Sequence, residues 1–381
     1  MKKRLFILTA IVLASCSQPL ENRLDGILKP VFPEGEPGAA VLVMKGDTVL
    51  YDKGFGLANL ETGAKIDGDT PLNIASISKQ FTAVAVLQLE QEGKLSLGDP
   101  VSKYFPEFES KIWEDVRLAH LLSHSSGIPD ARGYLSREEK INGDEDLAVE
   151  YMKTLDYRNF FPGTAYEYVN PTFVLCGKIV EKVSGQPFTE YVWEHIFKPA
   201  GMDKTYYFDR NIEALEVSHG YEYANVEDMP EERTAGQQVG PKDWYEYDFG
   251  EETFFATRPD GGIYTSTHEF VKWEKALREA SVLNAEQLQQ AFFPRTYVSG
   301  SPWSDYQNRE NTWYGYGWFM EPATETTPLR IYHTGDNGGY KALAARYPEQ
   351  NLLILIFANR ADWDRYGLWM QIEKELLSTQ N

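Results

Sequence analysis

The chain has 381 residues, enough to bury a large core in one large domain or two intertwined ones. Its content of 42% hydrophobic and 25% charged residues is ordinary for a soluble globular protein. The formal net charge of −20, from 57 acidic and 37 basic residues, argues against a nucleic-acid partner, because binding phosphates requires a basic surface.

The first fifteen residues have the pattern of an export signal. A basic segment at residues 1–4 precedes an apolar run at 5–14, which is too short to span a bilayer as a permanent helix. The run ends in Leu-Ala-Ser-Cys at positions 13–16, which resembles the lipobox of bacterial lipoproteins. The sequence therefore predicts removal of residues 1–15 and lipidation of Cys16; the alternative is an ordinary signal peptide with an incidental cysteine.

Hydrophobic periodicity predicts strands at both ends of the chain and helices between them. The expected helices and strands are a short helix at 22–29, strands at 38–44 and 48–56, a helix of about four turns within 73–93 that starts at 76–79, helices at 117–124, 144–154, 171–184, 188–197, 267–280 and 284–292, strands at 313–320, 329–335, 339–347 and 352–358, and a final helix at 362–377. Residues 222–260 lack a clear period and are interpreted as a surface excursion. This order predicts an α/β layer built from the two ends of the chain beside a helical insert.

The helix at 73–93 carries the first candidate site. Apolar residues recur at helical spacing, and Gly93 ends the pattern, as glycine commonly does just past a helix end. Ser76 and Lys79 lie three residues apart, so both side chains point to one side of the first turn. A serine nucleophile needs a neighbour that takes its proton, which a desolvated amine can do. Alone, the pair is more typical of a capping serine followed by a solvated lysine, and only its later partners change this interpretation.

Two later triplets supply partners for this pair. Tyr-Val-Asn at 168–170 precedes a predicted helix, and His-Thr-Gly at 333–335 lies on a predicted strand. With Ser-Ile-Ser-Lys at 76–79, they resemble the Ser-x-x-Lys, Tyr-x-Asn and Lys/His-Thr/Ser-Gly motifs of the serine β-lactamase and penicillin-binding-protein superfamily. The branch that they resemble most contains class C β-lactamases, D-alanyl-D-alanine carboxypeptidases and esterases.

The resemblance extends over residues 30–375, through segments such as 121–129, 161–202, 261–264 and 314–318. It implies an α/β (α+β) fold of the β-lactamase/transpeptidase type, with an antiparallel sheet flanked by helices and an all-helical lobe. The expected boundaries are a signal peptide at 1–15, a tether at 16–21 and a catalytic domain at 22–381. Within that domain, 22–75 and 310–381 would form the α/β lobe and 76–309 the helical lobe.

The resemblance implies three catalytic residues. Ser76 would attack a carbonyl and form an acyl-enzyme, Lys79 would share or accept the proton, and Tyr168 would lie between the nucleophile and the leaving group. Either Lys79 or Tyr168 would be the general base, and the sequence leaves both alternatives open. Without the family pattern, the same residues would be an N-cap, a surface lysine and a core tyrosine.

Two side chains are expected beside this catalytic group. Asn170 would orient Lys79 and a substrate amide, although it could also cap the following helix. His333 replaces the lysine of class C β-lactamases, and its imidazole would position Tyr168 or a substrate carboxylate. A histidine satisfied within the strand is the alternative.

The strand at 329–335 is expected to hold the substrate. Thr334 could hydrogen-bond a substrate carboxylate, and Gly335 would let the substrate approach the strand closely. The resemblance assigns the oxyanion hole to the backbone N–H groups of Ser76 and Asp336.

Other candidates are weaker. His120 and His124 lie four residues apart on one predicted helical face, but no third metal ligand is evident, so no metal is expected. Cys176, in an apolar helix, is interpreted as a small buried hydrophobe. No phosphate-binding loop or dinucleotide fingerprint is present, and no cofactor is expected.

The sequence therefore predicts a periplasmic serine hydrolase of the bacterial cell envelope, anchored in a membrane through Cys16. Its substrate would be a small peptide or ester, such as one derived from the cell wall, as for a D-amino-acid peptidase, carboxypeptidase or esterase. A class C-like β-lactamase and an inactive protein that binds penicillin or peptides are the alternatives, and a metalloprotein using His120 and His124 is a third. Loops near 130–145, 222–260 and 293–312 are expected to shape the pocket.

Overall fold

The computed structural model describes residues 18–136, 138–139, 143–208, 218–223, 244–246, 257–304 and 310–377. The predicted signal peptide and Cys16 lie outside these residues, as does most of the excursion at 222–260. Within the described ranges, no helix has the length and apolarity needed to cross a bilayer.

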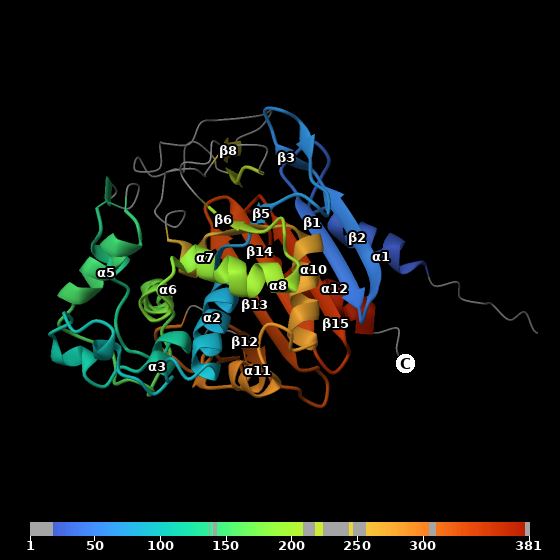
Figure 1. The fold of residues 1–381 in the computed structure, drawn as a ribbon. Coiled ribbons are helices and arrows are strands. Elements are labelled where there is room, and N and C mark those ends of the chain that lie inside the picture. Colours follow the sequence, from blue (N-terminus) through green and yellow to red (C-terminus); the bar gives the residue numbers. More distant parts are fainter. Residues whose placement is uncertain are drawn as a thin grey trace, which may run out of the picture.

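An eight-stranded antiparallel sheet forms the centre of the fold (Figure 1). Its strand order is β10-β11-β12-β13-β14-β15-β1-β2, so the N-terminal hairpin adds to the C-terminal strands, with Ala39 opposite Ala358. The strands are β1 (Ala39–Lys45), β2 (Thr48–Phe55), β10 (Thr296–Tyr297), β11 (Trp313–Tyr314), β12 (Phe319–Glu321), β13 (Arg330–Asn337), β14 (Tyr340–Tyr347) and β15 (Leu352–Ala358). Shorter strands outside this sheet are β3 (Leu57–Asn59), β4 (Ala64–Lys65), β5 (Leu72–Asn73), β6 (Tyr206–Tyr207), β7 (Tyr221–Tyr223), β8 (Trp244–Glu246) and β9 (Ile263–Thr265).

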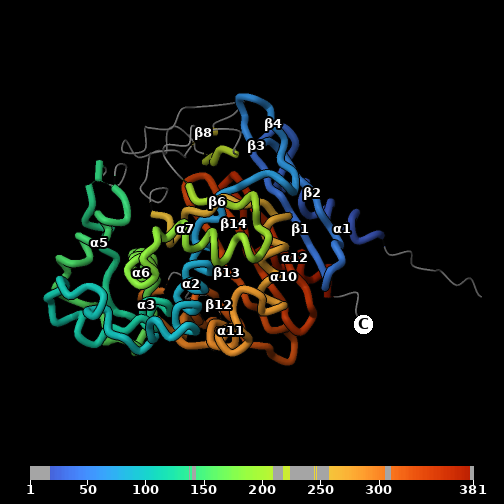
Figure 2. The backbone as a smooth tube through the Cα atoms, viewed as in Figure 1, coloured from blue at the N-terminus to red at the C-terminus, as the bar shows by residue number. Residues whose placement is uncertain are grey.

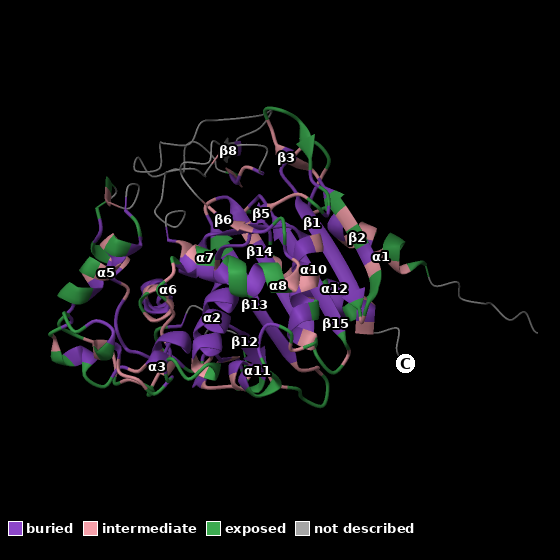
Figure 3. Cartoon of the chain, viewed as in Figure 1, coloured by how far each residue is buried: buried purple, intermediate pink, exposed green. Residues whose placement is uncertain are grey.

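The sheet is covered on both faces, which explains why its central strands are continuous apolar runs (Figure 3). Alternate residues of β1 enter different cores: Val41 packs with α1 and α12, whereas Leu42 packs on the side of α2 and α10. The tube in Figure 2 shows α1 and α12, from opposite ends of the chain, close together beside the sheet.

The helices lie on the two faces of the sheet and in a helical region beside α2 (Figure 1). They are α1 (Leu20–Leu28), α2 (Lys79–Gln91), α3 (Leu118–Leu122), α5 (Glu145–Thr154), α6 (Asn170–Ser184), α7 (Phe188–Val192), α8 (Lys198–Ala200), α9 (Arg258–Gly261), α10 (Thr267–Arg278), α11 (Ala285–Ala291) and α12 (Arg365–Leu377). Because α6 packs against α2, it brings the triplet at 168–170 toward Ser76.

The predicted strands and most helices are confirmed to within a few residues, but three assignments were wrong in detail. The helix predicted at 117–124 ends at Leu122, because His124 adopts a left-handed backbone with φ +51°. The helix predicted at 188–197 is α7 followed by a π-helical turn at Trp193–Phe197. The strand predicted at 313–320 is two strands, separated by a turn in which Gly317 (φ +87°) lies against the backbone of Lys79.

Candidate active site

Ser76 lies on a 3₁₀ turn, η1 (Ala75–Ser78), that leads directly into α2. The preceding residue, Ala75, has the unusual φ of +46°, and its N–H donates to Asn73 Oδ1 at 2.8 Å. Such a strained conformation persists only where its surroundings fix it. Ser76 remains half-buried while Ala75 and Ile77 are fully buried, so the turn presents its hydroxyl at the edge of the core.

Lys79 is completely buried, and its Nζ contacts three oxygens. It is 3.0 Å from Ser76 Oγ, 2.6 Å from Asn170 Oδ1 and 2.7 Å from the carbonyl oxygen of Asp260. An amide or carbonyl oxygen can only accept, so a neutral amine would use its two N–H groups on Asn170 and Asp260. The lone pair of that amine would then face the Ser76 hydroxyl, which is the arrangement required of a base.

Burial lowers the pKa of Lys79 to about 7, because the desolvated ammonium is penalised. The carboxyl group of Asp260 acts in the opposite direction, and the nearby Arg132 guanidinium adds to the lowering. A substantial neutral fraction of Lys79 therefore exists at neutral pH.

Asp260 and Arg132 are two charged residues of this site that sequence reasoning missed. Asp260 is on α9, 1% exposed, and burial raises the pKa of its carboxyl group. Its Oδ1 makes no hydrogen bond within the described part of the chain. Arg132 is held by Asp130, with Nη2 2.6 Å from Oδ2. Its position directly before Gly261 could have pointed to Asp260, because residues 261–264 are one of the segments that resemble the family.

Tyr168 lies beside the lysine, just before α6. Its ring centre is 5.0 Å from Lys79 Nζ, and the His124 ring packs against it at a tilt of 38°, with the ring centres 4.2 Å apart. The Val169 N–H donates to His124 Nδ1 at 3.2 Å. Burial, with the charge of Lys79, holds the pKa of His124 well below its usual range, so this imidazole is neutral. His124 thus serves as a support for Tyr168, a role that the sequence did not predict.

Asn170 and His333 occupy different environments. Val169, not Asn170, is the N-cap of α6, and the Asn170 side chain turns to Lys79 instead. His333 is 1% exposed; its Nδ1–H donates to the Thr334 carbonyl at 2.6 Å, and Nε2 accepts from the Tyr314 hydroxyl at 2.9 Å. Burial lowers the pKa of His333 to about 3, so the residue replacing lysine carries no charge.

Strand β13 passes close to the serine turn. Gly335 is so near η1 that a Cβ there would lie 2.2 Å from the Ile74 carbonyl oxygen. Thr334 is buried on the same strand, and Asp336 is exposed, its Oδ2 accepting from Arg365 Nη1 at 2.8 Å. Strand β12 pairs with β13 only as far as Tyr332. In the described residues, the following edge of β13 has no strand partner on that side.

His120 and His124 do not form the pair that the sequence suggested. His120 Nδ1 accepts from the Arg117 N–H at 3.1 Å, and His124 lies beyond the end of the helix, so the two do not share a helical face. Among the described residues, no group of three or more His, Cys, Asp or Glu has the arrangement of a metal site. Cys176 is buried, which raises the pKa of its thiol and confirms its interpretation as a hydrophobe.

The chain is similar to known proteins over most of its length. The Beta-lactamase family matches residues 29–376. Penicillin-binding protein 4* of Bacillus subtilis is 27% identical over 357 residues, covering 92% of this chain and 74% of that protein. For other curated relatives the chain spans only 63% of their length.

Solved structures show the same fold. A penicillin-binding protein from Bacillus halodurans has a TM-score of 0.75 at 25% identity, covering 93% of this chain and 99% of that one. A D-amino acid amidase from Ochrobactrum anthropi has a TM-score of 0.76 at 20% identity, covering 94% and 99%.

Proposed function

This chain belongs to the β-lactamase family of serine hydrolases, and we propose that it hydrolyses amide or ester bonds through an acyl-enzyme on Ser76. The observation that carries the proposal is the contact between Ser76 Oγ and a buried lysine amine whose other neighbours accept hydrogen bonds. This geometry allows Lys79 to take the serine proton as Oγ attacks the carbonyl carbon.

The tetrahedral intermediate needs donors for its oxyanion, and we assign these to the backbone N–H groups of Ser76 and Asp336. The close approach of Gly335 to Ile74 supports this assignment, because it holds β13 against the serine turn. Collapse of the intermediate expels an amine or alcohol, and the proton on Lys79 passes to it, directly or through the Tyr168 hydroxyl. Water then attacks the acyl carbon and gives its proton to Lys79, which passes a proton to Ser76 Oγ as the bond between Oγ and the acyl carbon breaks and the acid leaves.

The substrates we propose are D-amino-acid peptides or amides, including carboxypeptidase-type substrates, and esters. The fold shared with the D-amino acid amidase is consistent with the first class; at 20% sequence identity, the likeness is one of fold alone. Reaction with β-lactams is a second candidate, favoured by the penicillin-binding relatives. The neutral His333 argues against efficient β-lactam turnover, since it offers no fixed charge to a β-lactam carboxylate.

We further propose that the protein is a periplasmic lipoprotein of a bacterial envelope, with a lipid on Cys16. The support is sequence alone: the basic start, the short apolar run and the lipobox-like Leu-Ala-Ser-Cys at 13–16. Metabolic labelling with a palmitate analogue should mark the wild type and fail with Cys16→Ala. Equal labelling of the variant would overturn the anchor.

The catalytic proposal is tested with a fluorophosphonate probe and one substrate panel. The panel offers short-chain p-nitrophenyl esters, D-alanyl-D-alanine peptides, D-amino-acid amides and nitrocefin. The probe should label the wild type, which should also hydrolyse at least one class of substrate. Ser76→Ala should show neither labelling nor hydrolysis, and its melting temperature should equal that of the wild type. Labelling without turnover would instead support the inactive binding protein. Equal turnover by Ser76→Ala would refute the proposal.

A further inference from the structure

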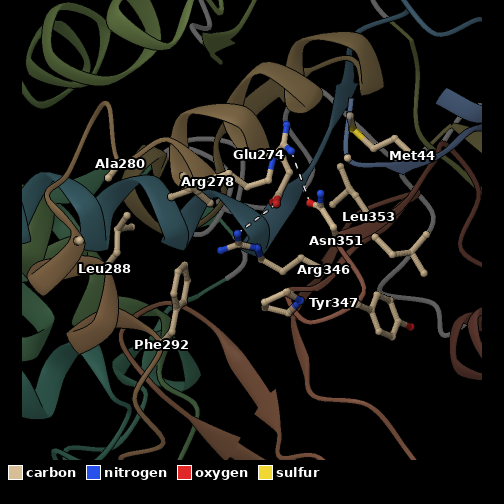
Figure 4. A pocket seen from close by; sticks show the side chains of 15 residues that line it. Met44, Glu274, Arg278, Ala280, Leu288, Phe292, Arg346, Tyr347, Asn351 and Leu353 are labelled. Atoms are coloured by element: carbon tan, nitrogen blue, oxygen red, sulfur yellow. Dashed lines mark hydrogen bonds and ion pairs between the residues drawn. The ribbon is translucent and has the colours of Figure 1, made fainter. Parts of the chain in front are cut away.

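A cavity opens at the far end of the strands that carry the active site. It has a volume of about 340 Å³ and is lined by α10, α11 and the ends of β14 and β15 (Figure 4). Gly335 of the active-site strand pairs with Ala342, and Arg346 is four residues further along β14. At about 3.3 Å per residue, the cavity lies roughly 13 Å along the sheet from that point. It is separate from the catalytic group.

The guanidinium of Arg346 is the notable polar group in this cavity. The residue is only 8% exposed, and Nη2 donates to Glu274 Oε1 at 3.1 Å. Its Nε and Nη1 are buried and make no hydrogen bond to any described residue. Its Cζ lies 4.7 Å from the ring centre of Phe292, so one face of the guanidinium is covered by an aromatic side chain. Buried N–H donors left in this way are costly, and native proteins normally satisfy them.

The rest of the lining combines polar and apolar side chains. Arg278 reaches Asn351 Oδ1 at 3.5 Å, as Figure 4 shows, and Asp47 Oδ1 at 2.6 Å. Its buried Nε likewise has no partner among the described residues. Met44, Leu277, Leu288 and Leu353 supply apolar walls. The lining thus contains two guanidinium groups and one carboxylate, and the size is within the usual range for small-molecule sites.

We propose that this cavity binds a small organic carboxylate with an apolar tail. The carboxylate would accept charge-assisted hydrogen bonds from the guanidinium of Arg346, which are stronger than hydrogen bonds between neutral groups. The tail would lie against the leucine and methionine walls. A cation is disfavoured, because the single lining carboxylate, Glu274, already accepts from Arg346. The site is independent of the hydrolytic chemistry at Ser76.

The test is calorimetric titration of the full chain with 4-phenylbutyrate and with its neutral amide. The acid should bind at least about tenfold more tightly than the amide, because only the carboxylate meets the guanidinium as an anion. Binding should fall by about tenfold or more in Arg346→Met/Glu274→Gln, which removes both charges and leaves neither one buried alone. A second variant, Ala285→Trp, keeps both charges but places a bulky ring at the exposed rim, and should also weaken binding.

The matched control is Arg23→Met, which removes an arginine paired with Glu375 on the surface. It should bind the acid as wild type does. Circular dichroism melts verify that each variant is folded, and 4-phenylbutyrate should raise the melting temperature of wild type and Arg23→Met only. Equal affinity for acid and amide, unchanged binding by the double variant, or no binding at roughly 10 mM acid would each overturn the proposal.

Discussion

Gly335 lies so close to Ile74 that only a glycine fits at position 335: a Cβ there would lie 2.2 Å from the Ile74 carbonyl oxygen. The atom it would meet is backbone, so β13 or the serine turn must shift to admit a methyl group. We expect Gly335→Ala to lower kcat/KM for a p-nitrophenyl ester by about 10²-fold or more, comparable to losing an oxyanion donor. Stability should fall by about 1–3 kcal/mol, the usual cost of overpacking.

Gly26→Ala is the control for that substitution. A Cβ at position 26 meets nothing within 4 Å, and the residue lies in the middle of α1. This variant should keep full activity and gain up to about 1 kcal/mol of stability from the better helix propensity of alanine. Equal activity of the two alanine variants would show that β13 does not need to lie so close to η1.

Lys79 predicts the shape of the pH–rate profile. Its pKa is about 7, and the form that accepts the Ser76 proton is the neutral one. The value of kcat/KM should therefore rise about tenfold per pH unit below the pKa and level off above it. Steady-state hydrolysis of p-nitrophenyl acetate, corrected with Ser76→Ala, measures this. A rate that falls as the pH rises through 7 would mean that the ammonium, and not the amine, is the active form.

Two charged neighbours of Lys79 should shift the inflection of the pH–rate profile, the pH at which kcat/KM levels off, in opposite directions. Arg132 lowers the pKa of Lys79, so Arg132→Gln should shift the inflection to higher pH. Asp260 raises the pKa of Lys79, so Asp260→Asn should shift it to lower pH, while the backbone carbonyl that contacts Nζ is kept. Comparing both profiles with wild type under the same salt tests the assignment. Shifts in one direction for both variants would assign the inflection to another group.

The three motifs were readable from sequence because each contains a rare combination of residues at a fixed place in the order of strands and helices. Ser76, Lys79 and Asn170 meet as expected, since α2 and α6 pack together through apolar faces that the periodicity revealed. The strands of the sheet were equally accessible, because burial on both faces makes them long apolar runs.

The residues that were missed act through contacts that sequence spacing does not encode. Asp260 is 181 positions from Lys79 and meets it through a backbone carbonyl, which any residue could provide. His124 reaches Tyr168 only because its left-handed backbone ends the predicted helix early. Tyr314 donates to His333 because a turn at Gly317 divides one predicted strand into two. Each depends on tertiary packing and not on local pattern.

A buried ion network, remote from the catalytic residues, predicts a loss of stability without a defect in chemistry. Arg330 on β13 donates to Glu373 of α12 at 2.6 Å and to Glu321 of β12 at 2.8 Å, and its side chain is 8% exposed. The two carboxylates hold the pKa of the guanidinium above its usual range. Arg330→Met would leave both carboxylates in the core without their cation, which should cost about 3–5 kcal/mol.

Urea unfolding of Arg330→Met measures this loss, with Arg158→Met as the matched control. Arg158 pairs with Asp115 in an exposed ion pair at 2.7 Å, so its removal should cost no more than about 1 kcal/mol. Below its unfolding transition, Arg330→Met should keep the wild-type kcat/KM, because the network does not touch Ser76 or Lys79. Similar unfolding free energies for the two variants would show that the network contributes little, since the carboxylates would then find protons or water at small cost.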